Sequence, residues 1–476
     1  MTLCWSPNRS KMTKLIRQGF IALVSAGLVA CSNLSAGNLF SHYSQQTSAT
    51  YQLLSSGQYA QAIEQLPDGV AGDILDNMER GRLEFLNANY PGSLAALNAS
   101  DAAVKEWQQQ ASISISESAN TVGSFITNDN LRSYQPSDYE LGFLHLYLSL
   151  NYLKKGDLEG ALVEVRRANL VQEQARKERE KELRSAEKSA KEQGISPKLG
   201  SVLSRYPSAG KTLQAVQNGY LFFYSGLLYE TEGNLNSAYI DYKRALAVAP
   251  ENNVVIEATL RTATKLGMKQ DLAQLTRRYG QYQPLPRHQG RVIVIDEQSV
   301  VKALQGWKQP LPLYDSHGNT AIYNLALPYY PNTKVRDVSP LRLDEKNIMG
   351  STVVNVNAMA ERDLTERLPA MVVRQALRIV AKDGLRKTTR GSSNEELGNL
   401  LFNIYNTLSE QPDTRSWQSL PAQVQLYSKA LSAGKHHLSW NGEQLEFDVS
   451  KGKTTLIWAS RQGISTTWWQ IKLGEI

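Results

Sequence analysis

Few residues of this chain have the types and spacing that catalysis or metal binding requires. The 476 residues include six histidines and two cysteines, and among the histidines only His436 and His437 are neighbours. Neighbouring residues of a β-strand point to opposite faces of a sheet, so this pair is poorly placed to chelate a metal ion. The chain has no HExxH sequence, no phosphate-binding glycine-rich loop with a lysine and no GxSxG motif. We therefore predict no catalytic residue, no metal site and no cofactor, and we do not expect an enzyme.

One charge pattern stands out in the last third of the chain. Basic residues occupy every fourth position at Arg374, Arg378, Lys382, Arg386 and Arg390. On a helix they form a slowly winding ridge, opposite the apolar residues Leu368, Val372, Ile379 and Val380. Like charges at this spacing repel by roughly 0.2–0.5 kcal/mol per pair, so an anionic contact would offset a real cost.

Two alternatives account for this basic ridge. It either meets acidic residues of the same protein, or it faces solvent and contacts lipid phosphates, peptidoglycan carboxylates or an acidic partner. The helix lies between strand-rich segments, so we expect its apolar side to cover a sheet and its basic side to face outward.

Cys31 is a candidate site of lipid attachment, because it ends a short apolar run. Four basic residues and no acid precede the run, and residues 19–30 fall short of the roughly 20 that a membrane-spanning helix needs. This pattern is typical of a secretory signal. The run ends in "LVAC", which resembles the bacterial lipobox. The resemblance implies cleavage before Cys31 and three acyl chains on it, a permanent anchor at about 0.8 kcal/mol per buried CH2. Ser32, following the cysteine, implies the outer membrane, with the protein facing the periplasm.

Composition limits the class of partner. Removal of residues 1–30 takes four basic residues from the 52 and none of the 45 acids, which leaves a net charge of +3. This small excess gives no support for nucleic-acid binding. Cys4 leaves with the signal, so no intramolecular disulfide can form.

The helical part of the chain carries internal repeats. The segment 222–250, "FFYSGLLYETEGNLNSAYIDYKRALAVAP", follows the tetratricopeptide (TPR) pattern. Its predicted packing residues are Phe222, Gly226, Tyr229, Ala238, Tyr242 and Ala245. The small residues allow two antiparallel helices to approach closely, and the aromatic residues fill the space that remains. A second copy at 145–168 matches at Tyr152, Gly156, Ala161 and Ala168.

Other segments extend this repeat region. We expect a weaker copy at 51–66, helical pairs at 73–107 and 252–279, and a long ordered loop at 112–140. Residues 173–193 are highly charged and lack an apolar seam, which predicts a projecting solvated helix more than a coiled-coil arm. His145 is interpreted as a packed helix residue.

A different composition begins after "PLPRHQG" at 284–290. The run 291–295, "RVIVI", indicates a strand, and a helix pair is expected at 355–390, within a helical region that extends to about 410. Short strands are expected at 423–431, 436–440, 444–449, 454–459 and 465–473.

The predicted fold class is therefore α+β: an all-α TPR-like domain, then a β-rich domain with an inserted helix pair and a small β-sandwich-like C-terminus. The predicted parts are a signal peptide (1–30), a lipidated linker (31–48), the repeat domain (49–283) and the β-rich domain (284–476).

Four stretches together resemble an uncharacterised Gram-negative family of TPR-containing lipoproteins. They are "NDNLRSYQPSDYE" (128–140), "NYLKKGDLEGALVEVRRAN" (151–169), "VNAMAERDLTERLPAMVVRQALRIVAK" (356–382) and "DTRSWQSLPAQVQ" (413–425). Members are often encoded beside a lipoprotein activator of penicillin-binding proteins, which implies a connection with peptidoglycan synthesis. The resemblance assigns no functional residue.

The function that we expect is a protein-binding adaptor or scaffold in the cell envelope, whose repeats form a groove for a peptide or helix. The β-rich domain would either dock on that groove or offer a second surface. The alternatives are a structural subunit of a larger envelope or secretion complex, which would expose a large apolar patch, and a cell-wall carbohydrate-active enzyme, which would pair carboxylates in a cleft.

Lipidation can be tested by Cys31→Ser. We expect this variant to lose palmitate labelling and membrane retention, because no other segment of the sequence provides an anchor. Palmitate labelling that persists in the variant would contradict the lipoprotein assignment.

Overall fold

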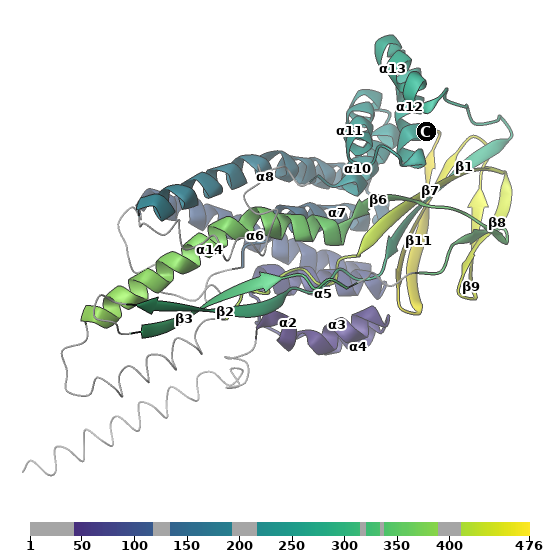
Figure 1. Ribbon diagram of the computed structural model, residues 1–476. Coiled ribbons are helices and arrows are strands. Elements are labelled where there is room, and N and C mark those ends of the chain that lie inside the picture. The colour runs from purple at the N-terminus through teal and green to yellow at the C-terminus, as the bar shows by residue number, and fades with distance from the viewer. Residues whose placement is uncertain (1–41, 118–133, 193–216, 315–319, 334–337, 389–410) are drawn as a thin grey trace, which may run out of the picture.

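The computed structural model describes residues 42–117, 134–192, 217–314, 320–333, 338–388 and 411–476 (Figure 1). In the described residues helices make up the N-terminal half and strands predominate in the rest, as the sequence predicts. Cys31 and the predicted signal lie outside the described residues.

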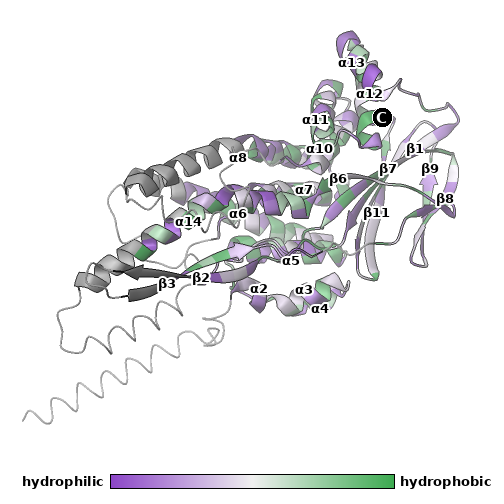
Figure 2. Cartoon of the chain, viewed as in Figure 1, coloured by the Kyte–Doolittle hydropathy of each residue, from purple (hydrophilic) through white to green (hydrophobic). Residues whose placement is uncertain are grey.

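Three helix pairs form the described part of the repeat region. They are α7 (Asp138–Lys155) with α8 (Leu158–Glu192), α10 (Gly219–Glu232) with α11 (Leu235–Val248), and α12 (Asn253–Lys265) with α13 (Lys269–Tyr279). Gly156 and Gly233 end the first helix of two pairs with φ of +86° and +90°, a left-handed conformation that costs glycine little. Helix α13 closes the array; it is largely hydrophilic and has no buried residue (Figure 2).

Small residues let the repeat helices approach closely. A Cβ placed on Gly226 would lie 2.7 Å from the ring of Tyr242, so this contact between α10 and α11 requires glycine. The other predicted packing residues of this pair are buried, namely Phe222, Tyr229, Ala238, Tyr242 and Ala245. In the preceding pair Ala161 and Ala168 are fully buried, while Tyr152 is half-buried.

The N-terminal helices correct two predictions. They are α2 (Tyr43–Gln46), α3 (Ser48–Ser55), α4 (Tyr59–Glu64), α5 (Asp73–Leu86) and α6 (Tyr90–Glu117). The predicted linker 31–48 is wrong at its end, because Tyr43 and Thr47 are buried and the Thr47 hydroxyl donates to Gln418 Oε1 at 2.9 Å. The loop predicted from residue 112 is also wrong at its start, since α6 continues to Glu117.

Within the described residues the strands form two sheets and a separate hairpin. The larger sheet has the order β11-β10-β1-β7-β6, formed by β1 (Gln289–Gln298), β6 (Ser351–Asn355), β7 (Gln423–Ser432), β10 (Thr454–Gln462) and β11 (Ser465–Gly474). The smaller has the order β5-β4-β8-β9, formed by β4 (Arg342–Leu343), β5 (Lys346–Asn347), β8 (Gly434–Trp440) and β9 (Glu443–Val449). The hairpin consists of β2 (Gln305–Tyr314) and β3 (Thr320–Tyr329). The strands predicted after residue 422 are confirmed.

Strand β1 is buried on both faces. Successive side chains of a strand alternate between faces. Ile293 and Ile295 accordingly join the core shared with the helices, while Val292 and Val294 join a second core against the smaller sheet. The larger sheet is therefore the middle layer between the repeat helices and the smaller sheet.

One long helix, α14 (Val356–Thr388), replaces the helix pair predicted at 355–390. It runs through Pro369, and the neighbouring Leu368 and Val372 are fully buried. Packing on both sides of the proline compensates for the backbone donor that it removes. The helix lies along α8 and the β2–β3 hairpin (Figure 1). Gln375 fixes it there, because its amide donates to the carbonyl of Ala326 and accepts from its N–H at 3.0 Å.

Packing of the best repeat can be tested at Ala238, which is fully buried. We expect Ala238→Leu to lower the free energy of unfolding by about 1–3 kcal/mol, because the added atoms force the helices apart. Ala273→Leu, at an exposed position of α13, is the matched control and should have little effect. A wild-type denaturation curve for Ala238→Leu would contradict the close contact.

Candidate functional site

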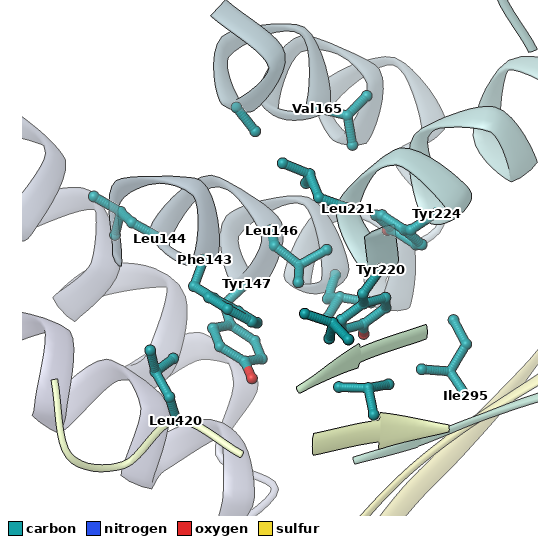
Figure 3. Packing of buried hydrophobic residues seen from close by; sticks show 14 of the residues in the cluster. Phe143, Leu144, Leu146, Tyr147, Val165, Tyr220, Leu221, Tyr224, Ile295 and Leu420 are labelled. Carbon is teal, nitrogen blue, oxygen red and sulfur yellow. The ribbon is translucent and has the colours of Figure 1, made fainter. Parts of the chain in front are cut away.

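The inner side of the repeat helices is covered by the protein's own sheet. Tyr147 of α7 and Tyr220 of α10 are fully buried, and their hydroxyls donate to the carboxylate of Glu297 in β1 at 3.1 and 3.2 Å. Figure 3 shows these side chains directed from the helices toward the strands. The described helices therefore have no open groove on this side, although an adaptor was expected to have one. Of the two arrangements expected for the β-rich region, docking on the repeat helices or offering a second surface, the structure has the first.

Arg82 completes this contact from a third helix. Its Nη2 lies 2.6 Å from Oε2 of Glu297, and both side chains are fully buried. The indole of Trp458 in β10 donates to Glu297 Oε1 at 3.1 Å, and the Arg82 guanidinium lies 4.3 Å from the centre of the Tyr147 ring. We call Arg82, Tyr147, Tyr220, Glu297 and Trp458 the Glu297 cluster. It links α5, α7 and α10 to two strands.

Two more buried carboxylates hold the segment 411–422, which leads into β7. Glu79 of α5 accepts hydrogen bonds from the backbone N–H groups of Gln418 and Ser419. Glu140 of α7 accepts from the N–H of Trp417 at 2.7 Å and from the Tyr134 hydroxyl. Burial is the main cause that raises the pKa of both carboxyls, that of Glu79 to about 7.

A cavity of about 160 Å³ lies next to this segment. Its walls come from the start of α7, the middle of α14, strand β3 and residues 413–416. Its charged lining consists of Asp363, Arg367, Arg374, Asp413 and Arg415. Its remaining lining includes tyrosines, Ser416 and apolar side chains.

The cavity is built from arginine–aspartate pairs. Arg415 is held by Asp413 in a bidentate pair, with Nε–Oδ1 of 2.9 Å and Nη2–Oδ2 of 2.7 Å. Nε of Arg367 lies 3.4 Å from Oδ2 of Asp363, which also accepts from the Ser137 hydroxyl at 2.9 Å. Arg374 adds a third guanidinium to the two carboxylates of the lining. This arrangement suits the binding of an anion better than acid–base catalysis.

The predicted basic ridge does not form one outward surface. Arg374 lines the cavity and is half-buried, and Arg378 is buried with only 5% exposed, so the outward orientation expected for the ridge is wrong at Arg378. Helix α14 has neighbours on more than one side, which sequence periodicity does not reveal. The side chains of Lys382 and Arg386 lie outside the described residues, as does Arg390.

The histidines considered as candidate ligands contact acidic side chains of the described chain. His145 is buried, with Nδ1 2.8 Å from Oε2 of Glu164, and His436 lies 2.6 Å from Asp344. Among the described residues no three His, Cys, Asp or Glu side chains gather as metal ligands. No described helix is both long enough and apolar enough to cross a membrane.

The buried carboxylates were not found from the sequence. The sequence "RVIVIDE" (291–297) did carry a signal, since two acids end a run whose continuous hydrophobicity is typical of a strand buried on both faces. Glu79 and Glu140 lie in ordinary helical contexts that offered no such signal.

No known protein family and no curated protein matches the chain. Among solved structures, MamA (AMB-1) is 12% identical over 49% of this chain and 87% of that chain, with a TM-score of 0.27. MamA (MSR-1) is 14% identical over 42% of this chain and 91% of that chain, with a TM-score of 0.17. Likenesses at these scores support no inference about function.

Stability should fall as pH rises through about 7, because burial raises the pKa of Glu79 from 4.5 to about 7. Between these values the folded protein holds a proton that the unfolded chain has released. This contribution is complete below about 4.5 and is lost above about 7. Glu79→Gln removes the titration, so we expect its urea midpoint to change less than that of the wild type between pH of about 5 and about 8.

Glu84→Gln, on the same helix, is the control and should keep the wild-type pH dependence. An unchanged pH dependence in Glu79→Gln would show that Glu79 does not titrate in this range.

Proposed function

We propose that the protein is a lipid-anchored scaffold of the bacterial cell envelope that binds another protein through the outer surface of its repeats. The observation that carries this proposal is the burial of the inner surface of the repeats against the protein's own sheet. A partner of the repeats must then use the opposite side.

Exposed apolar residues lie on that outer side. Of six large hydrophobic residues exposed in the described chain, Val163, Leu170 and Ile240 belong to α8 and α11. Val163 and Leu170 are seven positions apart, which places them on one face of α8. The two helices are neighbours there, because Asn169 Nδ2 lies 3.1 Å from Asp241 Oδ2. We call these three residues the outer apolar face; its apolar side chains favour a protein partner.

Anchoring at Cys31 and an outer-membrane, periplasm-facing location are part of this proposal and rest on the "LVACS" sequence. Peptidoglycan synthesis is the process to test first, on the resemblance described above. A structural subunit of a larger envelope complex is the alternative, and the outer apolar face suits it equally. A carbohydrate-active enzyme is less well supported, since the two aspartates lining the cavity are each held by an arginine.

The test compares two sets of substitutions at exposed apolar residues. Crosslinked envelopes are used to recover partners of the lipidated protein, of Val163→Ser/Leu170→Ser/Ile240→Ser and of the control Met349→Ser/Ile464→Ser. We expect a partner that the wild type and the control both recover and that the first variant loses. Equal recovery by all three would contradict a role for the outer apolar face.

A further inference from the structure

We propose that the cavity beside α14 binds a small carboxylate that carries a short apolar group. This inference is independent of the scaffold function, because the cavity is lined by residues of α7, α14, β3 and the segment 411–422, and by no residue of the outer apolar face.

The size of the cavity limits the ligand. Its volume of about 160 Å³ is close to the roughly 150 Å³ of an engineered protein cavity that holds benzene. A bound group of about six non-hydrogen atoms would therefore fill it. Sites for drug-sized ligands are larger, roughly 300–1,000 Å³.

The charges of the lining favour an anion. Three guanidinium groups, those of Arg367, Arg374 and Arg415, face two carboxylates, those of Asp363 and Asp413. Each guanidinium has five N–H donors in a planar fork, so one side chain can hold a carboxylate of the protein and one of a ligand together. Glu140 lies behind the wall, where hydrogen bonds from Tyr134, Ser137 and Trp417 take up its oxygens.

Ser416 supplies a second, independent observation. Ser416 lines the cavity and is buried, with 5% of its surface exposed. Its Oγ has no hydrogen-bond partner among the described residues. The Oγ is closed to water in this conformation, so rotation of the side chain would bring it to a ligand oxygen in the cavity. Buried hydroxyl groups almost always have a partner, and such a ligand would supply one.

The rest of the lining explains the preference for an apolar group. Leu304, Pro328, Ala360, Leu364 and Met371 bring apolar side chains to the same cavity. A carboxylate such as propionate, or the terminal alanine of a peptide, can contact the arginines with its oxygens and these side chains with its carbon atoms. Inorganic phosphate has no apolar part and would leave that wall uncovered.

Calorimetric titration of the full chain tests the proposal with four probes: propionate, its neutral isostere propionamide, inorganic phosphate and the peptide Gly-Gly-Ala with a free carboxylate. We expect propionate to bind at least about fivefold more tightly than propionamide or phosphate. Binding of the peptide as well would identify a chain terminus as the source of the carboxylate, and binding of propionate alone would identify a free acid. Either result supports the carboxylate site.

Three variants assign the binding to the cavity. Arg374→Gln should weaken propionate binding at least about fivefold, and Arg277→Gln, at an exposed position of α13, should leave it unchanged. Ser416→Ala should weaken it about two- to threefold without loss of stability, and this variant decides the question if Arg374→Gln fails to fold. Equal affinities for propionate and propionamide, tighter binding of phosphate, or wild-type propionate binding by Ser416→Ala and by a folded Arg374→Gln would overturn the proposal.

Discussion

The buried pair of Arg82 and Glu297 joins a helix of the N-terminal half to a strand of the C-terminal half in a place that water does not reach. A lone charge there would cost several kcal/mol, so each residue requires the other. Tyr147, Tyr220 and Trp458 donate the hydrogen bonds that the carboxylate still needs. The Glu297 cluster therefore forms only when three helices, α5, α7 and α10, meet two strands, β1 and β10.

Strand β1 carries a buried acid–arginine pair on each of its two faces, so it joins the helices to the smaller sheet. Alternation along the strand directs Glu297 to the helices and the preceding Asp296 to the smaller sheet. There Asp296 is fully buried and pairs with Arg461 at 2.5 Å. Each face of the central strand thus carries one acid, and each acid has one arginine. With the sheet fixed against the inner side of the repeats, Glu79 and Glu140 can hold the segment 411–422, and that segment forms one wall of the cavity beside α14.

The local features of this fold could be predicted from the sequence because they depend on near neighbours. Local sequence patterns located the C-terminal strands to within a few residues. The turn between β8 and β9 shows how local this information is, since Asn441 and Gly442 adopt φ of +47° and +85° there. Small residues at repeat positions located the helix pairs. The sequence also identified Arg374 as a residue of interest, although for a surface and not for a cavity.

Two failures are local, namely the start of the loop predicted at 112 and the break expected within 355–390. The others concern contacts between distant segments. Nothing near Thr47 indicates that Gln418 binds it, and nothing in the spacing of α14 shows that neighbours cover Arg378. The groove was expected to be open because a repeat array has a concave side, but periodicity cannot show what fills it. The cavity follows from the same long-range contacts, since α7, α14 and the segment 411–422 approach one another only in the folded chain.

A double-mutant cycle on Arg82 and Glu297 tests the central claim most directly, with the free energy of unfolding as the measured quantity. We expect Arg82→Leu and Glu297→Leu each to cost about 3–5 kcal/mol and the double variant to cost much less than their sum, because it leaves no buried charge alone. Asp68→Asn, which breaks the exposed pair between Asp68 and Arg80, a neighbour of Arg82 in α5, should cost less than about 1 kcal/mol. If the Arg82 and Glu297 substitutions are additive, or as mild as Asp68→Asn, the two halves are not held together at this cluster.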